Sequence, residues 1–130
     1  MDKKYIELFK NLAQATAATA EQVMDYDRQK NDEKGLETAT IMRDDFQALA
    51  DIISTYGENY QINKSDVAKL LVAATIQVNQ INDRINNLKQ AMTGYQTDVI
   101  PKLQEVLDNA KSDEDATKLA NEKFIIENND

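Results

Sequence analysis

The sequence predicts an all-α protein, an antiparallel up-down-up-down four-helix bundle that forms a single domain over residues 1–130. Four segments carry apolar residues at alternating steps of three and four, the spacing that keeps an apolar stripe on one side of a helix, as in coiled-coil heptads. The three glycines fall where these segments would be joined. No segment shows the alternation of apolar and polar residues that a half-buried strand requires.

The first two helices are expected at residues 3–30 and 36–56. The first stripe consists of Tyr5, Phe9, Leu12, Thr16, Thr19, Val23 and Tyr26, and the second of Ala39, Met42, Phe46, Leu49, Ile53 and Tyr56. The connection around Gly35 is short, which favours antiparallel neighbours. Gly57 directly follows the second stripe and marks its end, since glycine accepts the left-handed conformation of a helix C-cap.

The third helix is expected at residues 65–93 and has the most regular stripe. Its members are Val67, Leu71, Ala74, Val78, Ile81, Ile85, Leu88 and Met92. Asn63 or Ser65 would cap its start, and Gly94 would end it in the left-handed conformation.

The fourth helix is expected at residues 98–127, with Pro101 in its first turn, where a missing N–H does no harm. The run Ser-Asp-Glu-Asp that begins at Ser112 has the form of a capping box, which starts a new helix. The fourth helix therefore either breaks near Ser112 or runs on to about Glu127. An apolar face continues in both cases, made of Ala116, Leu119, Ala120, Phe124 and Ile125.

Missing residue types exclude most familiar catalytic centres. The chain has no histidine and no cysteine, so zinc sites of these residues, serine–histidine and cysteine–histidine pairs, and the Glu-x-x-His di-iron sites of helical bundles cannot form. Neighbouring acids such as Asp44 and Asp45 point about 100° apart on a helix and do not converge. The sequence therefore predicts no catalytic residue, no metal site and no cofactor, in a protein that is not an enzyme.

The net charge of −8 is spread along the chain, so it repels phosphates and anionic lipids. No apolar run reaches the length of a membrane span, and the first residues do not form a signal peptide. We expect a cytoplasmic protein with no nucleic-acid or membrane partner. Four stripes can cover one another in a monomer, whereas an amide-rich face of the third helix leaves a homodimer open. This face contains Gln77, Asn79, Gln80, Asn82, Asn86, Asn87 and Gln90.

The leading functional hypothesis is a protein–protein interaction or structural module with an unidentified protein partner. Its candidate contact residues are Tyr60, Ile62, Asn59, Tyr56 and Tyr5. Tyr60 and Ile62 lie in the connection 57–64, outside every helical stripe, and exposed aromatic side chains often anchor partners. We expect Tyr5, Tyr56 and Tyr60 to meet at one end of the bundle, joined by Phe9 and Phe124. In the alternative interpretation, the tyrosine rings are buried and only the hydroxyl groups reach water.

Two other functions remain open. Thr16 and Thr19 interrupt the first stripe, and such small residues either allow close helix packing or leave a groove. A groove at these threonines would make the protein a small-molecule or peptide sensor. The acidic charge also permits a mimic of DNA, although the dispersed lysines dilute the negative surface.

Overall fold

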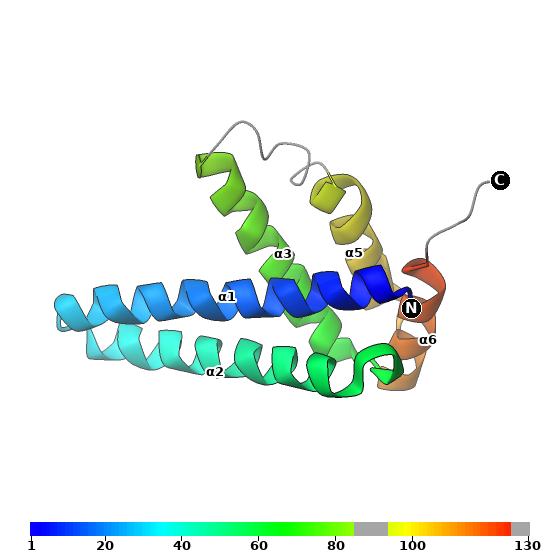
Figure 1. Cartoon of the computed structure of the whole chain (residues 1–130), viewed down its shortest axis with the longest axis horizontal. Coiled ribbons are helices and arrows are strands. Elements are labelled where there is room, and N and C mark those ends of the chain that lie inside the picture. The colour runs from blue at the N-terminus through cyan, green and yellow to red at the C-terminus, as the bar shows by residue number, and fades with distance from the viewer. Residues whose placement is uncertain (85–93, 126–130) are drawn as a thin grey trace.

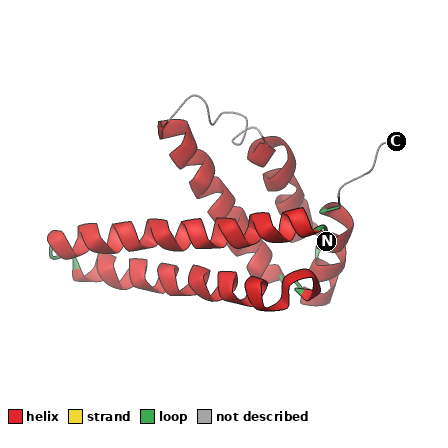
Figure 2. Ribbon diagram, viewed as in Figure 1, coloured by secondary structure: helices red, strands yellow, loops and turns green. Residues whose placement is uncertain are grey.

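A computed structural model of the protein describes residues 1–84 and 94–125, and the side chains of 81–84 are outside that description. The elements are α1 (Lys3–Gln29), α2 (Glu33–Tyr56), η1 (Gly57–Asn59), α3 (Lys64–Arg84), η3 (Tyr95–Val99), α5 (Ile100–Asn109) and α6 (Asp113–Lys123). The all-α helical bundle is confirmed, and no strand occurs in the part of the chain that the structure describes (Figure 2).

The two longest helices, α1 and α2, form an antiparallel hairpin (Figure 1). The next helix, α3, crosses α1 and packs against α5, and both are inclined steeply to the hairpin. The last helix, α6, stands across the end of the hairpin beside the N-terminus, where the Asp2 N–H donates to the Phe124 carbonyl (2.9 Å). Because residues 85–93 lie outside the described residues, the up-down-up-down topology stays a prediction.

The turn between α1 and α2 is tighter than expected and lies earlier in the chain. Asn31 adopts a positive φ of 57°, which asparagine tolerates better than most residues. Asp32 then caps α2 by accepting a hydrogen bond from the Gly35 N–H (2.9 Å). Gly35 therefore lies within the first turn of α2. A Cβ atom there would lie 2.5 Å from Oδ2 of Asp32 and 2.8 Å from Oδ2 of Asp27, so the close approach explains the glycine.

The other two glycines differ from each other. Gly57 ends α2 with a φ of 53°, and its N–H donates to the Ile53 carbonyl. Gly94, by contrast, has φ −58° and ψ −44°, which are helical values, so the expectation that it ends the third helix in a left-handed cap is wrong. It instead precedes a helical segment that continues to Asn109.

This last long segment contains a π-helical turn and then a break. In η3 the Ile100 N–H donates to the Tyr95 carbonyl, five residues back. Pro101 follows at the start of α5, and a proline ring clashes with the carbonyl four residues earlier in a regular α-helix. The wider π turn relieves that clash. Ser112 then caps α6 by accepting from the Asp115 N–H (3.2 Å), which confirms the split.

The core lies where α3, α5 and α6 meet the half of the hairpin nearest the N-terminus. Its largest fully buried side chains include Phe9, Phe124, Leu12, Ile53, Ile62, Leu70 and Leu103. Val23 and Tyr26, at the other end of the α1 stripe, are exposed. In Figure 1, α3 crosses α1 well before the hairpin turn, so no described helix covers the stripe there.

The glycines give a matched test of the fold. Gly35→Ala should lower the free energy of unfolding, because the new Cβ displaces the Asp32 carboxylate and weakens a cap that contributes about 1 kcal/mol. Gly94→Ala should raise it by about 0.5–1 kcal/mol, since this glycine is helical and no described atom lies within 4 Å of the Cβ position. Urea denaturation measures both. An equal gain in both variants would show that the carboxylates simply rotate away.

Candidate partner-binding surface around the α2–α3 connection

The connection from α2 to α3 is an extended segment whose alternate side chains enter the core. After η1, Tyr60 is 4% exposed and Ile62 is 0% exposed, whereas Gln61 between them is exposed. This burial corrects the premise that Tyr60 and Ile62 stand outside the packed interior. That the connection binds a partner stays a prediction, and its exposed residues, such as Asn59, are the ones available for contact.

Tyr60 is fixed at its polar end as well as by its ring. Its hydroxyl donates to Oδ2 of Asp66 in the first turn of α3. Asn63 caps the same helix by accepting from the Asp66 N–H (2.8 Å). Burial raises the pKa of Tyr60 far above its usual value, and the hydrogen bond to Asp66 and the charge of that carboxylate raise it further. Tyr60 therefore remains a protonated donor across the physiological pH range.

The connection is also tied to α6. The Thr117 hydroxyl donates to the carbonyl of Ile62, and the Lys64 N–H donates to Oδ1 of Asp113 (3.1 Å). The segment 60–63 is thus held on one side by α3 and on the other by α6. The same segment separates two hollows in the surface, since Gln61 and Asn63 line both of them.

The first hollow, which we name the α2 pocket, has a volume of about 520 Å³. Its lining residues are Ile52, Tyr56, Asn59, Tyr60, Gln61, Asn63 and Asp66. Ile52 is 46% exposed and Tyr56 is 59% exposed, so the pocket has an apolar rim that water contacts. Three of the five residues expected from sequence to meet a partner, Tyr56, Asn59 and Tyr60, therefore line one pocket.

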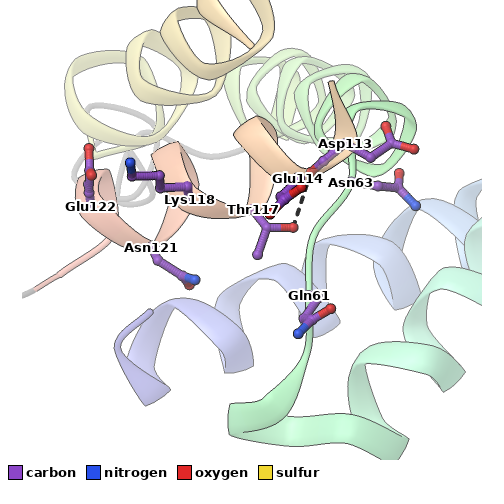
Figure 3. A pocket seen from close by; sticks show the side chains of 8 residues that line it. All are labelled: Gln61, Asn63, Asp113, Glu114, Thr117, Lys118, Asn121 and Glu122. Atoms are coloured by element: carbon purple, nitrogen blue, oxygen red, sulfur yellow. Dashed lines mark hydrogen bonds between the residues drawn. The ribbon is translucent and has the colours of Figure 1, made fainter. Parts of the chain in front are cut away.

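The second hollow, the α6 groove, lies on the opposite side of the connection and is larger, about 880 Å³. It is lined by Gln61, Asn63, Asp113, Glu114, Thr117, Lys118, Asn121 and Glu122. Figure 3 shows that the α6 side chains of Asn121 and Thr117 lie on the side of the helix nearest Gln61. All the lining residues are polar or charged, so the groove lacks the apolar anchors that usually dominate a protein interface.

The apolar rim of the α2 pocket continues along α2 as a second stripe, distinct from the stripe predicted from Ala39 to Tyr56. Ile41, Ala48, Ile52 and Tyr56 are all exposed. Steps of seven, four and four place these four side chains on one side of the helix. We name them the α2 outer face. The buried stripe of α2 lies on the opposite side, where α1 covers it. The sequence signal for this surface is a second helical spacing of apolar residues beside the core stripe.

Tyr5 lies in a different cluster. Its ring packs edge-on against Phe124, with the centroids 5.1 Å apart, and Phe9 completes the group 4.9 Å from Phe124. The Tyr5 hydroxyl donates to Asp98 (2.6 Å), which also pairs with Lys102 (2.6 Å). Tyr5 does not line the α2 pocket that Tyr56 and Tyr60 share, and its expected role in partner contact stays a prediction.

The threonines of the first stripe are packed. Thr16 is fully buried and its hydroxyl donates to the Leu12 carbonyl (2.8 Å). Thr19 donates to Ala15 (3.0 Å) and accepts from Nε2 of Gln80 on α3 (3.1 Å). These contacts favour close packing over a groove, and ligand binding there stays a prediction. In the amide-rich face of the third helix, Asn86, Asn87 and Gln90 lie outside the described residues, as does the Asn82 side chain.

Within residues 1–84 and 94–125, no group of three acidic, histidine or cysteine side chains is placed to hold a metal ion. None of the helices in those ranges has the length and apolar character needed to cross a membrane. No protein-family model, curated protein or solved structure matches the chain.

Truncating a buried and an exposed isoleucine distinguishes the core of the protein from the α2 outer face. Ile62→Ala should lower the free energy of unfolding by about 2–5 kcal/mol, because it leaves a cavity in the core. Ile41→Ala should change it by less than about 0.5 kcal/mol, because Ile41 is exposed. Denaturation curves measure both effects. Similar values for the two variants would contradict the burial of the connection.

The Tyr5–Asp98–Lys102 cluster predicts a pH dependence. Burial alone would raise the pKa of Asp98, but hydrogen bonds from Lys102 and Tyr5 and the nearby lysine charges hold it below its ordinary value. A lowered folded-state pKa stabilises the protein above the unfolded pKa of about 3.9, and this contribution is lost as the pH falls through the folded value. The stability difference between wild type and Asp98→Asn should therefore be constant above about pH 5 and shrink below about pH 4.

Urea denaturation at several pH values measures that difference. Tyr5→Phe is the control, since it removes one of the hydrogen bonds to Asp98 and keeps the Lys102 pair. The stability difference between wild type and Tyr5→Phe should shrink over the same pH range, but by a smaller amount. A difference that does not vary between pH 7 and pH 3 would contradict the role assigned to the Asp98 carboxylate.

Proposed function

We propose that this protein is a non-enzymatic interaction module that binds a protein partner through the α2 outer face and the adjoining α2 pocket. The observation that carries this proposal is the exposure of Ile52 and Tyr56 at the rim of a pocket whose other wall is fixed by the core. Contiguous exposed apolar residues beside a hollow are typical of protein-binding sites. The cytoplasmic location and the absence of catalysis expected from the composition belong to the same proposal.

The dimensions of the surface favour a macromolecule over a small molecule. From Ile41 to Tyr56 the α2 outer face is about 22 Å long, at 1.5 Å per residue. A partner that spans this length contacts the helix face as well as the pocket, whereas a drug-sized ligand is enclosed by a pocket alone. Tyr56 supplies a large, rigid aromatic group, the kind of side chain that contributes most to binding at interfaces.

A capture experiment tests the proposal. The tagged protein is incubated with lysate of its source organism, and bound proteins are identified by mass spectrometry. The double substitution Ile52→Ser with Tyr56→Ser should lower the recovery of a stoichiometric partner at least tenfold, since it removes the apolar contacts and leaves the core unchanged. Circular dichroism and the melting temperature verify that the variant is folded.

Val72→Ser is the matched control, because Val72 is an exposed apolar residue on α3 outside the lining of the α2 pocket. It should leave the recovery unchanged. If the partner is lost equally in both variants, or retained in both, the surface of α2 is not the binding site. A partner retained only after Val72→Ser supports the proposal.

A further inference from the structure

The charges around the α2 outer face define the chemistry of its partner. Between Ile41 and Asp66 the chain carries five acidic residues and two basic ones: Asp44, Asp45, Asp51, Glu58 and Asp66, against Arg43 and Lys64. Arg43 is already paired with Asp44 (2.9 Å) and with Glu21 of α1 (3.6 Å). The unneutralised charge of this surface is therefore negative.

Several of these carboxylates are free to bind a cation from a partner. Asp45 and Glu58 are exposed and form no ion pair within the described residues. Asp66 lines the α2 pocket, and only its Oδ2 atom is used, by the Tyr60 hydroxyl. Its Oδ1 atom accepts no hydrogen bond from the described part of the chain. A lysine or arginine of a partner would find charge-assisted acceptors next to the apolar rim.

The shape of the apolar surface specifies the fold of the partner segment. The exposed apolar residues follow one side of a straight helix at steps of seven, four and four, and no other described helix lies along them. A second helix packs against such a stripe by placing its own apolar residues at steps of three and four. About fifteen residues of partner helix match the length from Ile41 to Tyr56.

Resting on the proposed function, we infer that the α2 outer face binds an amphipathic helix of about four turns, whose apolar stripe is flanked by lysine or arginine residues. The apolar stripe packs on Ile41, Ala48, Ile52 and Tyr56. The basic side chains pair with Asp45, Glu58 and the free oxygen of Asp66. Acidic charge thereby selects among helical partners, and the apolar face provides most of the binding free energy.

Two synthetic peptides test this inference directly. One is a capped fourteen-residue helix of leucine and lysine, with the leucines at steps of three and four. The other has glutamate in place of every lysine. Each is titrated into the ¹⁵N-labelled protein while amide chemical shifts are recorded. The lysine peptide should bind at least tenfold more tightly, and the shifts should concentrate at Ile41, Ile52, Tyr56, Asn59 and Asp66.

Charge variants locate the binding site. The double variant Asp45→Asn with Glu58→Gln should lower the affinity for the lysine peptide at least threefold, and Asp66→Asn should lower this affinity further. Because Asp66→Asn also alters the bond to Tyr60, the first double variant keeps the test independent of folding. Glu114→Gln with Glu122→Gln, which removes the same charge from the α6 groove, is the matched control and should have no effect.

The opposite results would overturn the inference. Equal affinity for the two peptides would show that charge plays no part, and shifts centred on the α6 groove would place the basic partner there. Sedimentation that shows a dimer abolished by Ile52→Ser would make a second copy of this chain the occupant. If the lysate partner depends on Ile52 and Tyr56 but its contact segment carries no basic residues, this inference fails while the proposed function stands.

Discussion

The arrangement of the whole protein depends on the entry of the α2–α3 connection into the core. Gly57 turns the chain with a positive φ, and the extended residues that follow bury the rings and methyl groups of Tyr60 and Ile62. Two hydrogen bonds, from Tyr60 to Asp66 and from Thr117 to the Ile62 carbonyl, hold this segment between α3 and α6. After α2 the chain therefore passes through the interior before α3 begins. As a result α3 packs on α1 and α5, and one side of α2 has no helical neighbour among the described elements.

Sequence periodicity was sufficient for the fold class and for several helix ends, because these depend on local rules. The Ser112 cap, the position of Pro101 and the stop at Gly57 all follow from backbone chemistry within a few residues. The prediction of a C-cap at Gly94 is wrong because a glycine is compatible with a helix as well as with its end. Local rules predict a turn at Gly35, whereas its close contact with two aspartates depends on the packing of two helices.

The candidate surface could be predicted only in part. Tyr56, Asn59 and Tyr60 do share a pocket, but an apolar residue outside a helical stripe can lie on the surface or cross the interior. The alternation of Tyr60, Gln61, Ile62 and Asn63 carried the period-two signal of a segment with one side buried, and it was too short to stand out against four long helices. The outer stripe of α2 does not follow from periodicity alone, because periodicity shows which residues share a side of a helix and only the tertiary structure shows which sides are covered.

The far end of the α1–α2 hairpin has a consequence for the dynamics of the protein. Beyond the crossing with α3, the buried residues are two alanines, one methionine and one aspartate: Ala20, Ala39, Met24 and Asp27. Val23 and Tyr26 are exposed there. A two-helix segment with so little buried apolar area should have less local stability than the core around Phe9, to which α1, α2, α3, α5 and α6 all contribute. We therefore expect the hairpin tip to open as a cooperative unit of its own, without unfolding of the rest. Amide hydrogen exchange should accelerate along α1 toward its C-terminal end, while the amides near the buried connection exchange only through global unfolding.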